Sequence, residues 1–265
     1  MSTTAYAKLN LALHVRGRRA DGRHDIETLF VFCEDGDGIS AEAGDELVLT
    51  LSGPFASGLS PNSNLMIRAA TALRDHVGLT AGVRLHLDKR LPVASGVGGG
   101  SADAAATLRL LTELWEIDPA HAAAVAPGLG ADVPACLLSH PCIGRGAGDE
   151  LELVDLPELA GTAALLVNPR VELSTAAVFA AWDGVDRGAL GKWPDGRNDL
   201  EAAAIALVPQ IASVLAWLEA QSGTTVVRMS GSGATCFALF DNPDARDSAA
   251  DAVPREWWHL ATRLR

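Results

Sequence analysis

The first segment of the chain alternates between apolar side chains and a second, mainly polar set. On one side of an extended chain fall Leu9, Leu11, Leu13 and Val15, and on the other fall Lys8, Asn10, Ala12 and His14. A period of two is typical of a strand with one buried face. The pattern therefore predicts a half-buried strand from which Lys8 and Asn10 project on the same side.

Further periodic segments predict strands and helices in both halves of the chain. Strands are expected at 26–32, 46–51, 83–87, 163–167, 226–229, 234–240 and near Trp257. Helices are expected at 62–77, from the glycine-rich segment through Trp115, and from Asp118 to near Gly128. Asn198 and Glu201 have the spacing of a capping box, which predicts one long helix to about Gln221. The mixture indicates an α+β protein with a domain boundary near residue 155.

Composition limits the classes of protein to consider. The 265 residues are 48% apolar and 20% charged, as in ordinary globular proteins. There is no apolar run of membrane-spanning length and no signal-peptide pattern, so we expect a cytoplasmic protein. The net charge of −12 argues against nucleic acid or an anionic membrane as the main partner. A phosphate site would therefore need local positive groups, and lysine occurs only at positions 8, 89 and 192.

The cysteines and histidines show no ligand-like spacing. The four cysteines, Cys33, Cys136, Cys142 and Cys236, form no CxxC pair, and the seven histidines form no HExxH pattern. We therefore expect reduced thiols rather than a zinc site or a disulfide framework.

A glycine-rich segment lies between a predicted strand and a predicted helix. Glycine permits positive φ, consecutive amides in such a turn can face an anion, and the following helix adds partial positive charge at its start. The spacing fits neither a Walker loop nor a dinucleotide fingerprint. A phosphate-binding loop is favoured over a plain turn, and Ser101 is also a candidate Mg²⁺ contact. The candidate ATP-binding residues are Pro92, Val93, Ala94, Ser95, Gly96, Val97, Gly98, Gly99, Gly100, Ser101 and Ala102.

Three other positions suit phosphoryl transfer but also have simpler interpretations. Asp132 precedes Val133-Pro134, which is typical of a helix N-cap, and a capping carboxylate can still accept a proton. Lys8 is either a solvated lysine or a group that offsets charge on a transferring phosphoryl. Spacing alone does not show that Lys8 and Asp132 meet. The turn Ser230-Gly231-Ser232-Gly233 is either a plain hairpin or a second loop over phosphate or substrate.

Three segments taken together resemble the motifs of the GHMP kinases. They are residues 7–13, 92–106 and 230–234. Within that superfamily the chain is most similar to the kinases that act on 4-diphosphocytidyl-2-C-methyl-D-erythritol in the non-mevalonate isoprenoid pathway. Residues 21–24, 129–134 and 198–201 occur in the order which that subfamily shows. The resemblance runs nearly from end to end.

The resemblance implies a fold and a reaction. The implied fold joins an ATP-binding domain like ribosomal protein S5 domain 2, residues 1–155, to a ferredoxin-like substrate-side domain, residues 156–265, with the site between them. The implied reaction is Mg²⁺-dependent transfer of the ATP γ-phosphate to the 2-hydroxyl of the cytidine diphosphate-linked methylerythritol, by a monomer or homodimer. Lys8 and Asp132 match catalytic positions, and Asn64 matches a position near the adenine. The candidate substrate-binding residues are Asn10, Arg23, His24, Thr175, Phe179, Ser230, Gly231, Ser232 and Gly233.

One departure and several alternatives remain. Arg23 stands where the family usually has a tyrosine that stacks on cytosine, although a guanidinium plane can also stack on a base. Phe179 is either the opposite wall of such a site or an ordinary core residue. The alternatives are a homoserine or mevalonate type of GHMP kinase, a decarboxylating relative, or a nucleotide-binding module without catalysis. Such a module would need neither Lys8 nor Asp132.

Overall fold

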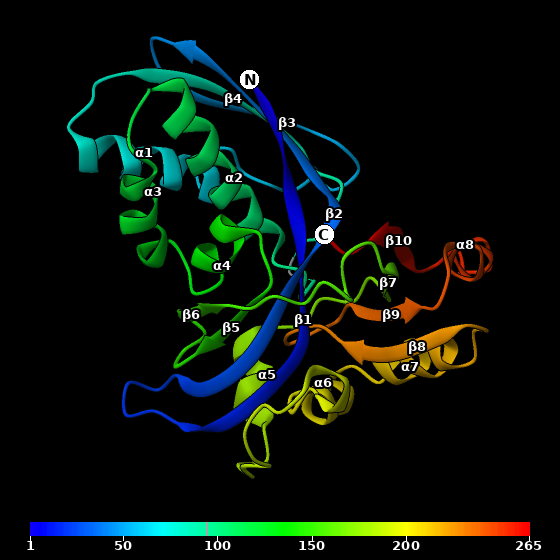
Figure 1. Ribbon diagram of the computed structural model, residues 1–265. Helices are drawn as coiled ribbons and strands as arrows, with labels where there is room; N and C mark the ends of the chain where they lie inside the picture. The colour runs from blue at the N-terminus through cyan, green and yellow to red at the C-terminus, as the bar shows by residue number, and fades with distance from the viewer. Residues whose placement is uncertain (94) are drawn as a thin grey trace. The chain divides into compact units, whose positions relative to one another are not determined.

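The computed structural model describes residues 1–93 and 95–265, which form two compact units. Unit 1 contains Met1–Ala7, Asp35–Val93 and Gly98–Ser139, and unit 2 contains Lys8–Glu34, residues 95–97 and His140–Arg265. The long strands β1 (Ser2–Arg18) and β2 (His24–Gly44) contribute residues to both units (Figure 1). The units interleave along the chain, and the expected domain boundary near residue 155 stays a prediction.

Unit 1 combines parts of β1 and β2 and two further strands with four helices. Its strands are ordered β3-β4-β2, with β3 (Leu47–Ser52) parallel and β2 antiparallel to β4 (Gly82–Asp88). The helices pack together (Figure 1) and are α1 (Leu65–Val77), α2 (Gly99–Leu114), α3 (Pro119–Val125) and α4 (Val133–Leu138), with a 3-10 turn η1 (Ala126–Gly128) after α3. The strands expected at 46–51 and 83–87 and the helix through Trp115 are confirmed to within a residue or so of their ends.

Helix α1 shows how the local sequence sets its ends. The Asn64 Oδ1 accepts a hydrogen bond from the Met66 N–H at 2.9 Å, which satisfies one of the free donors in the first turn. Gly78 ends the helix with φ of 71°, a left-handed conformation that glycine adopts without a Cβ clash. Of the two predicted caps, Asn64 is therefore confirmed and Asn62 is not used.

Unit 2 contains an antiparallel sheet with the strand order β10-β7-β9-β8. Its strands are β7 (Ala163–Asn168), β8 (Thr224–Met229), β9 (Cys236–Phe240) and β10 (Trp258–Arg263). Between β7 and β8 lie α5 (Thr175–Ala181), a 3-10 turn η2 (Trp193–Asp195), α6 (Glu201–Leu207) and α7 (Gln210–Glu219), and between β9 and β10 lies α8 (Pro243–Asp251). This β-α-β-β-α-β succession and strand order are ferredoxin-like, as expected.

The core of unit 2 lies between this sheet and its helices. Helices α7 and α8 pack on the sheet (Figure 1), and every residue of β7 is buried because the strand has neighbours on both edges. Leu13 and Val15 of β1 belong to the same buried cluster as Leu165 and Leu218. Two short strands, β5 (Cys142–Arg145) and β6 (Glu150–Leu153), continue from the first half of β2. The part of β1 that carries Leu13 and Val15 thus belongs to the core of unit 2.

The prediction of a half-buried first strand is wrong. On the side expected to be polar, Lys8, Asn10 and His14 are only 3%, 3% and 2% exposed. They tolerate burial because their polar atoms have partners within unit 2, such as the 2.7 Å bond from Lys8 Nζ to Asn10 Oδ1. Alternation identified the strand but not the partners that cover its second face.

The prediction of one long helix after Asn198 is also wrong. Helices α6 and α7 are separated at Val208-Pro209, where proline offers no N–H to continue the helical hydrogen bonds. The capping box does not form either, because the Glu201 carboxylate accepts from the Met229 N–H at 3.2 Å. Among the described residues, no helix is both long and apolar enough to cross a bilayer.

Candidate functional site

A chain of hydrogen bonds in unit 2 joins the three segments that carry the GHMP-like motifs. The Lys8 ammonium donates to Asn10 Oδ1 at 2.7 Å, and the Asn10 N–H donates to Ser230 Oγ at 3.1 Å. The Ser230 hydroxyl in turn donates to the Gly96 carbonyl at 3.0 Å. Residues 8–10, 96 and 230 are far apart in sequence, and the structure brings them together. Sequence reasoning had placed them in one site only through the resemblance.

Gly96 is required by this close approach. Its φ is +81°, and a Cβ at this position would lie 2.5 Å from the Ser230 carbonyl oxygen and 2.7 Å from that of Gly233. Thr235 N–H donates to the Ser95 carbonyl at 3.1 Å, which adds a second link between the two loops. The turn at 230–233 is therefore part of the glycine-loop arrangement rather than a plain hairpin.

The Ser230–Gly233 turn is also fixed by side chains from the chain before it. The Asn198 amide donates to the carbonyls of Met229 at 2.7 Å and Gly231 at 2.8 Å. Thr175 and Ser232 share a hydrogen bond of 2.8 Å between their hydroxyls. Sequence reasoning missed this role of Asn198, because its position before a helix indicated only a cap. The structure thus brings together two of the substrate-binding candidates, Thr175 and Ser232.

The start of helix α2 has the features of an anion site. Gly98 is the N-cap with φ of +66°, and it offers no side chain to satisfy the first amides of the helix. Gly99, Gly100, Ser101 and Ala102 form the first turn, and among the described residues of the loop only Gly96 and Gly98 have positive φ.

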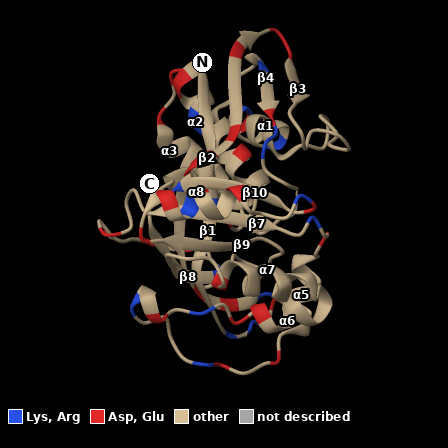
Figure 2. Cartoon of the chain, turned by 90° about the vertical axis from the view of Figure 1, so that its right-hand side faces the viewer, with Lys and Arg blue, Asp and Glu red and all other residues tan. Residues whose placement is uncertain are grey.

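Unpaired N–H groups and the helix dipole favour a phosphate at the start of α2. Acidic and basic residues are interspersed along the described chain (Figure 2), and the partial positive charge at the start of α2 comes from its own backbone N–H groups. The remaining loop candidates differ in position: Pro92, Ser95 and Val97 are buried, Val93 is exposed, and Ala94 lies outside the described residues.

A buried ion cluster in unit 1 supports the same helix start. The Lys89 ammonium lies 2.6 Å from Asp37 Oδ2 and 2.8 Å from Asp103 Oδ2, and all three residues are at most 3% exposed. Asp37 Oδ1 also accepts from the backbone N–H groups of Arg90 and Leu91. Asp103 belongs to α2, so the cluster connects this helix to the end of β4.

The charges of this cluster depend on one another. Burial disfavours the charged amine of Lys89, but Asp103 and Asp37 outweigh burial and raise its pKa. Burial raises the pKa of Asp103 to about 7, against the opposing effect of Lys89. Sequence reasoning missed the cluster, although the scarcity of lysine was a signal that Lys89 has a special environment.

Asp132 and Asn64, both in unit 1, occupy helix starts in different ways. Asp132 stands at the N-cap of α4, but its side chain makes no capping hydrogen bond, contrary to the simpler interpretation. Asn64 uses Oδ1 as the cap of α1, which leaves its amide nitrogen outside the cap. Lys8 belongs to unit 2, and its pairing with Asp132 stays a prediction.

A cavity of about 470 Å³ in unit 2 gathers three of the substrate candidates. Arg23, His24 and Phe179 line it, and the rings of His24 and Phe179 have centroids 4.9 Å apart. The His24 Nε2 is buried and has no hydrogen-bond partner among the described residues. Burial, with Arg18 nearby, lowers the pKa of His24. Arg23 is exposed and pairs with Asp21 at 2.9 Å, so its guanidinium remains at the rim.

The described residues contain no cluster of three or more His, Cys, Asp or Glu side chains that could hold a metal by itself. Mg²⁺ of the kinase type binds through one or two protein oxygens together with substrate phosphates and water, so it does not require such a cluster. Ser101, in the first turn of α2, is a suitable oxygen donor.

Comparison with known proteins identifies relatives along the whole chain. The model for the GHMP kinases N terminal domain matches residues 64–140, and the model for the GHMP kinases C terminal matches residues 181–260. The 4-diphosphocytidyl-2-C-methyl-D-erythritol kinase of Rhizorhabdus wittichii is 52% identical, with 98% of this chain and 94% of that protein covered. The kinase of the same name from Novosphingobium aromaticivorans is 51% identical, with 99% and 92% covered.

Solved structures give the same result. A crystal structure of 4-(cytidine 5'-diphospho)-2C-methyl-D-erythritol kinase matches with a TM-score of 0.87 at 34% identity, covering 100% of this chain and 99% of that one. Methanococcus jannaschii mevalonate kinase has a TM-score of 0.71 at 11% identity, covering 100% and 98%, and shares the fold. Because the two family models and the full-length relatives agree, the chain belongs to the GHMP kinase family.

Proposed function

We propose that the chain transfers the γ-phosphate of ATP to the 2-hydroxyl of 4-diphosphocytidyl-2-C-methyl-D-erythritol, giving the 2-phosphate and ADP in isoprenoid precursor biosynthesis. Relatives that carry this kinase name are about half identical to the chain over nearly its full length. The observation that carries the proposal is the hydrogen-bonded succession from Lys8 through Asn10 and Ser230 to Gly96. It assembles a cationic side chain, a hydroxyl and the glycine loop from three distant segments.

The ATP phosphates are proposed to bind the amides of the glycine-rich loop and the start of α2. Gly98 leaves these amides without a capping side chain, and the helix dipole favours negative charge there. Mg²⁺, held by Ser101 and the phosphate oxygens, would offset the charge of the triphosphate. The amide nitrogen of Asn64 is available for the adenine.

Asp132 is proposed as the base and Lys8 as the cation in the transfer step. The acceptor hydroxyl forms a bond to the γ-phosphorus while the bond to the bridging oxygen of ADP breaks, and Asp132 takes the hydroxyl proton. Asp132 is proposed for this role because it matches the catalytic aspartate position of the family that the chain belongs to. Lys8 is fixed by Asn10 and supports the negative charge of the transferring group.

The cytidine part of the acceptor is proposed to enter the cavity lined by Arg23, His24 and Phe179. A cytosine ring can stack on Phe179, and the free Nε2 of His24 can hydrogen-bond its polar edge. Asn10, Thr175 and the Ser230–Gly233 turn are proposed to hold the rest of the acceptor.

A coupled assay of ADP release tests this proposal. The purified chain is supplied with ATP, Mg²⁺ and, separately, the cytidylyl substrate, homoserine or mevalonate. We expect turnover with the cytidylyl substrate to exceed turnover with the other two alcohols by orders of magnitude. Equal or greater turnover with homoserine or mevalonate would reassign the acceptor, and ATP binding without any turnover would indicate a module that does not catalyse transfer.

A further inference from the structure

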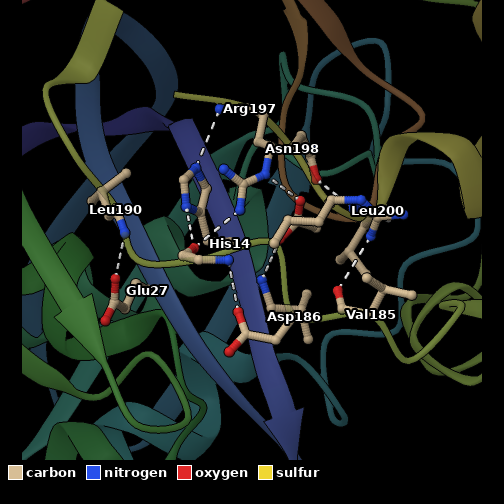
Figure 3. Close-up of polar contacts among 12 residues, drawn as sticks. His14, Glu27, Val185, Asp186, Leu190, Arg197, Asn198 and Leu200 are labelled. Carbon is tan, nitrogen blue, oxygen red and sulfur yellow. Dashed lines mark hydrogen bonds and ion pairs between the residues drawn. The ribbon is translucent and has the colours of Figure 1, made fainter. Parts of the chain in front are cut away.

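The irregular segment after helix α5, residues 183–190, is attached to β1 and β2 by charged side chains. Arg16 binds Asp186 with two bonds, Nε to Oδ1 at 2.9 Å and Nη2 to Oδ2 at 3.2 Å. The same guanidinium donates to Glu27 Oε1 at 3.2 Å. The other oxygen of Glu27 accepts from the Leu190 N–H at 2.5 Å (Figure 3). Arg16 and Glu27 therefore attach the segment at two points, Asp186 and Leu190.

His14 provides a third point of attachment. Its Nε2 accepts from the Arg197 N–H at 3.4 Å, so its Nδ1 carries the proton and donates to the Gly188 carbonyl at 3.1 Å (Figure 3). Arg197 Nη2 donates to the same carbonyl at 3.0 Å. The segment is thus fixed through its backbone at 188 and 190 and through a side chain at 186.

These contacts act on one wall of the cavity described above. Ala176, Phe179 and Ala180 of α5 form that wall, and Arg18 to Ile26 contribute to the other. Helix α5 has only seven residues, too few for a helix to be stable without tertiary contacts. The helix and the residue after it also contact β1 and β2 directly, because the Ala180 carbonyl accepts from Arg18 Nη2 at 3.3 Å and the Trp182 ring packs edge-on against His24. The attachments at 186, 188 and 190 hold the chain that follows, so they add to these contacts in limiting how far Phe179 can move from His24.

We propose that Arg16 is a positioning residue for the acceptor substrate: by binding Asp186 and Glu27, it holds the segment after α5 and so sets the width of the cavity between Phe179 and His24. Arg16 is not among the residues that line the cavity. The inference rests on the proposed function, because the cavity is where we place the cytidine group.

The expected effect is moderate. The side chains of Arg16, Glu27 and Asp186 are 26%, 21% and 43% exposed, and ion pairs at such positions are weak when isolated. Here one guanidinium makes a two-point contact with one carboxylate and also contacts a second, which is a stronger arrangement. Loss of Arg16 should loosen the segment without unfolding unit 2.

The decisive variant is Arg16→Met, which keeps most of the aliphatic stem and removes the guanidinium. We expect the KM for the cytidylyl substrate to rise about 3- to 10-fold, with kcat and the KM for ATP within about 2-fold of wild type. Asp186→Asn, which removes the charge but keeps an oxygen for the Gly188 N–H, should give a smaller change in the same direction. Arg84→Met is the control, because it removes an exposed arginine–glutamate pair in unit 1.

Hydrogen–deuterium exchange supplies a measurement that does not depend on catalysis. Amides of residues 176–190 should exchange faster in Arg16→Met than in wild type or Arg84→Met. The assignment of Arg16 would be overturned if Arg16→Met left the KM for the cytidylyl substrate unchanged. It would also be overturned if the KM for ATP rose by the same factor as the KM for the cytidylyl substrate. If the wild-type protein does not use the cytidylyl substrate, the proposed function fails. Unchanged hydrogen–deuterium exchange at residues 176–190 in Arg16→Met would separately overturn the role of Arg16 in holding α5.

Discussion

Among single residues, Asp132 is the one that we propose as the base of the transfer step. It begins helix α4 but gives its side chain to no capping bond, so removing its charge should leave the helix start intact. We predict that Asp132→Asn lowers kcat by about 10²- to 10⁴-fold, as expected for loss of a general base. Isothermal titration should show nearly unchanged ATP affinity, and the melting temperature should stay within experimental error. Turnover close to wild type would remove Asp132 from the role of base.

His24 gives a prediction about pH at the same scale. Burial lowers the pKa of His24 below the ordinary value of 6.5. As the pH falls, the unfolded chain is therefore protonated at His24 at a higher pH than the folded chain. The contribution of neutral His24 to stability is complete above pH 6.5 and is lost as the pH falls through its lowered value. Urea unfolding from pH 7.5 to 5 should therefore show a steeper loss of stability in wild type than in His24→Gln. Parallel curves for the two proteins would mean that His24 titrates normally.

At the scale of elements, the start of α2 depends on the buried cluster of Lys89, Asp37 and Asp103. Removing the ammonium leaves two carboxylates close together in a dry site. We predict that Lys89→Met lowers the free energy of unfolding by about 3–5 kcal/mol. The matched control is Lys192→Met, at an exposed lysine, which should change the same quantity by less than about 0.5 kcal/mol. Equal urea midpoints for the two variants would show that the cluster adds nothing to stability.

The elements also show what the sequence could predict. Caps and glycine stops located α1 well because they act within a few residues, alternation located β1 and β4, and a continuous apolar run located β7. Alternation could not reveal that both faces of β1 are buried, because the partners of Lys8 and Asn10 include residues as distant as Ser230. Spacing likewise indicated a capping box at Asn198, whereas its amide and the Glu201 carboxylate bind the chain around Met229.

The same limit applies to the site. The glycine loop could be identified from its own residues, since the backbone needs positive φ at Gly96 and Gly98. Its association with residues 8–10 and 230–233 came only from the resemblance to GHMP kinases. The cluster around Lys89 and the attachment of residues 183–190 by Arg16 escaped prediction, because their members are separated by up to 170 positions and no local pattern links them.

At the scale of the whole molecule, the two units are interleaved rather than consecutive. Residues 8–34 belong to unit 2, together with the chain after residue 139. Within that unit, Leu13, Val15 and Ile26 are at most 9% exposed and belong to one buried cluster with residues from 163 to 249. A cut at residue 155 would therefore separate these side chains from most of the apolar surface that covers them.

This arrangement predicts the behaviour of a fragment made of residues 1–155. Without residues 156–265, the apolar side of β1 is exposed to water, so we expect the fragment to aggregate or to lack fixed tertiary structure. Its amide proton–nitrogen spectrum should be poorly dispersed, and its urea unfolding should show no sharp transition, whereas the full chain should show both features of a folded protein. The sole tryptophan of the fragment, Trp115, belongs to unit 1 and reports on that unit directly. A well-dispersed spectrum with cooperative unfolding would instead establish residues 1–155 as an independent domain. Such a result would mean that the fragment folds although residues 8–34 lack the apolar side chains of residues 163–249 that cover them in the full chain.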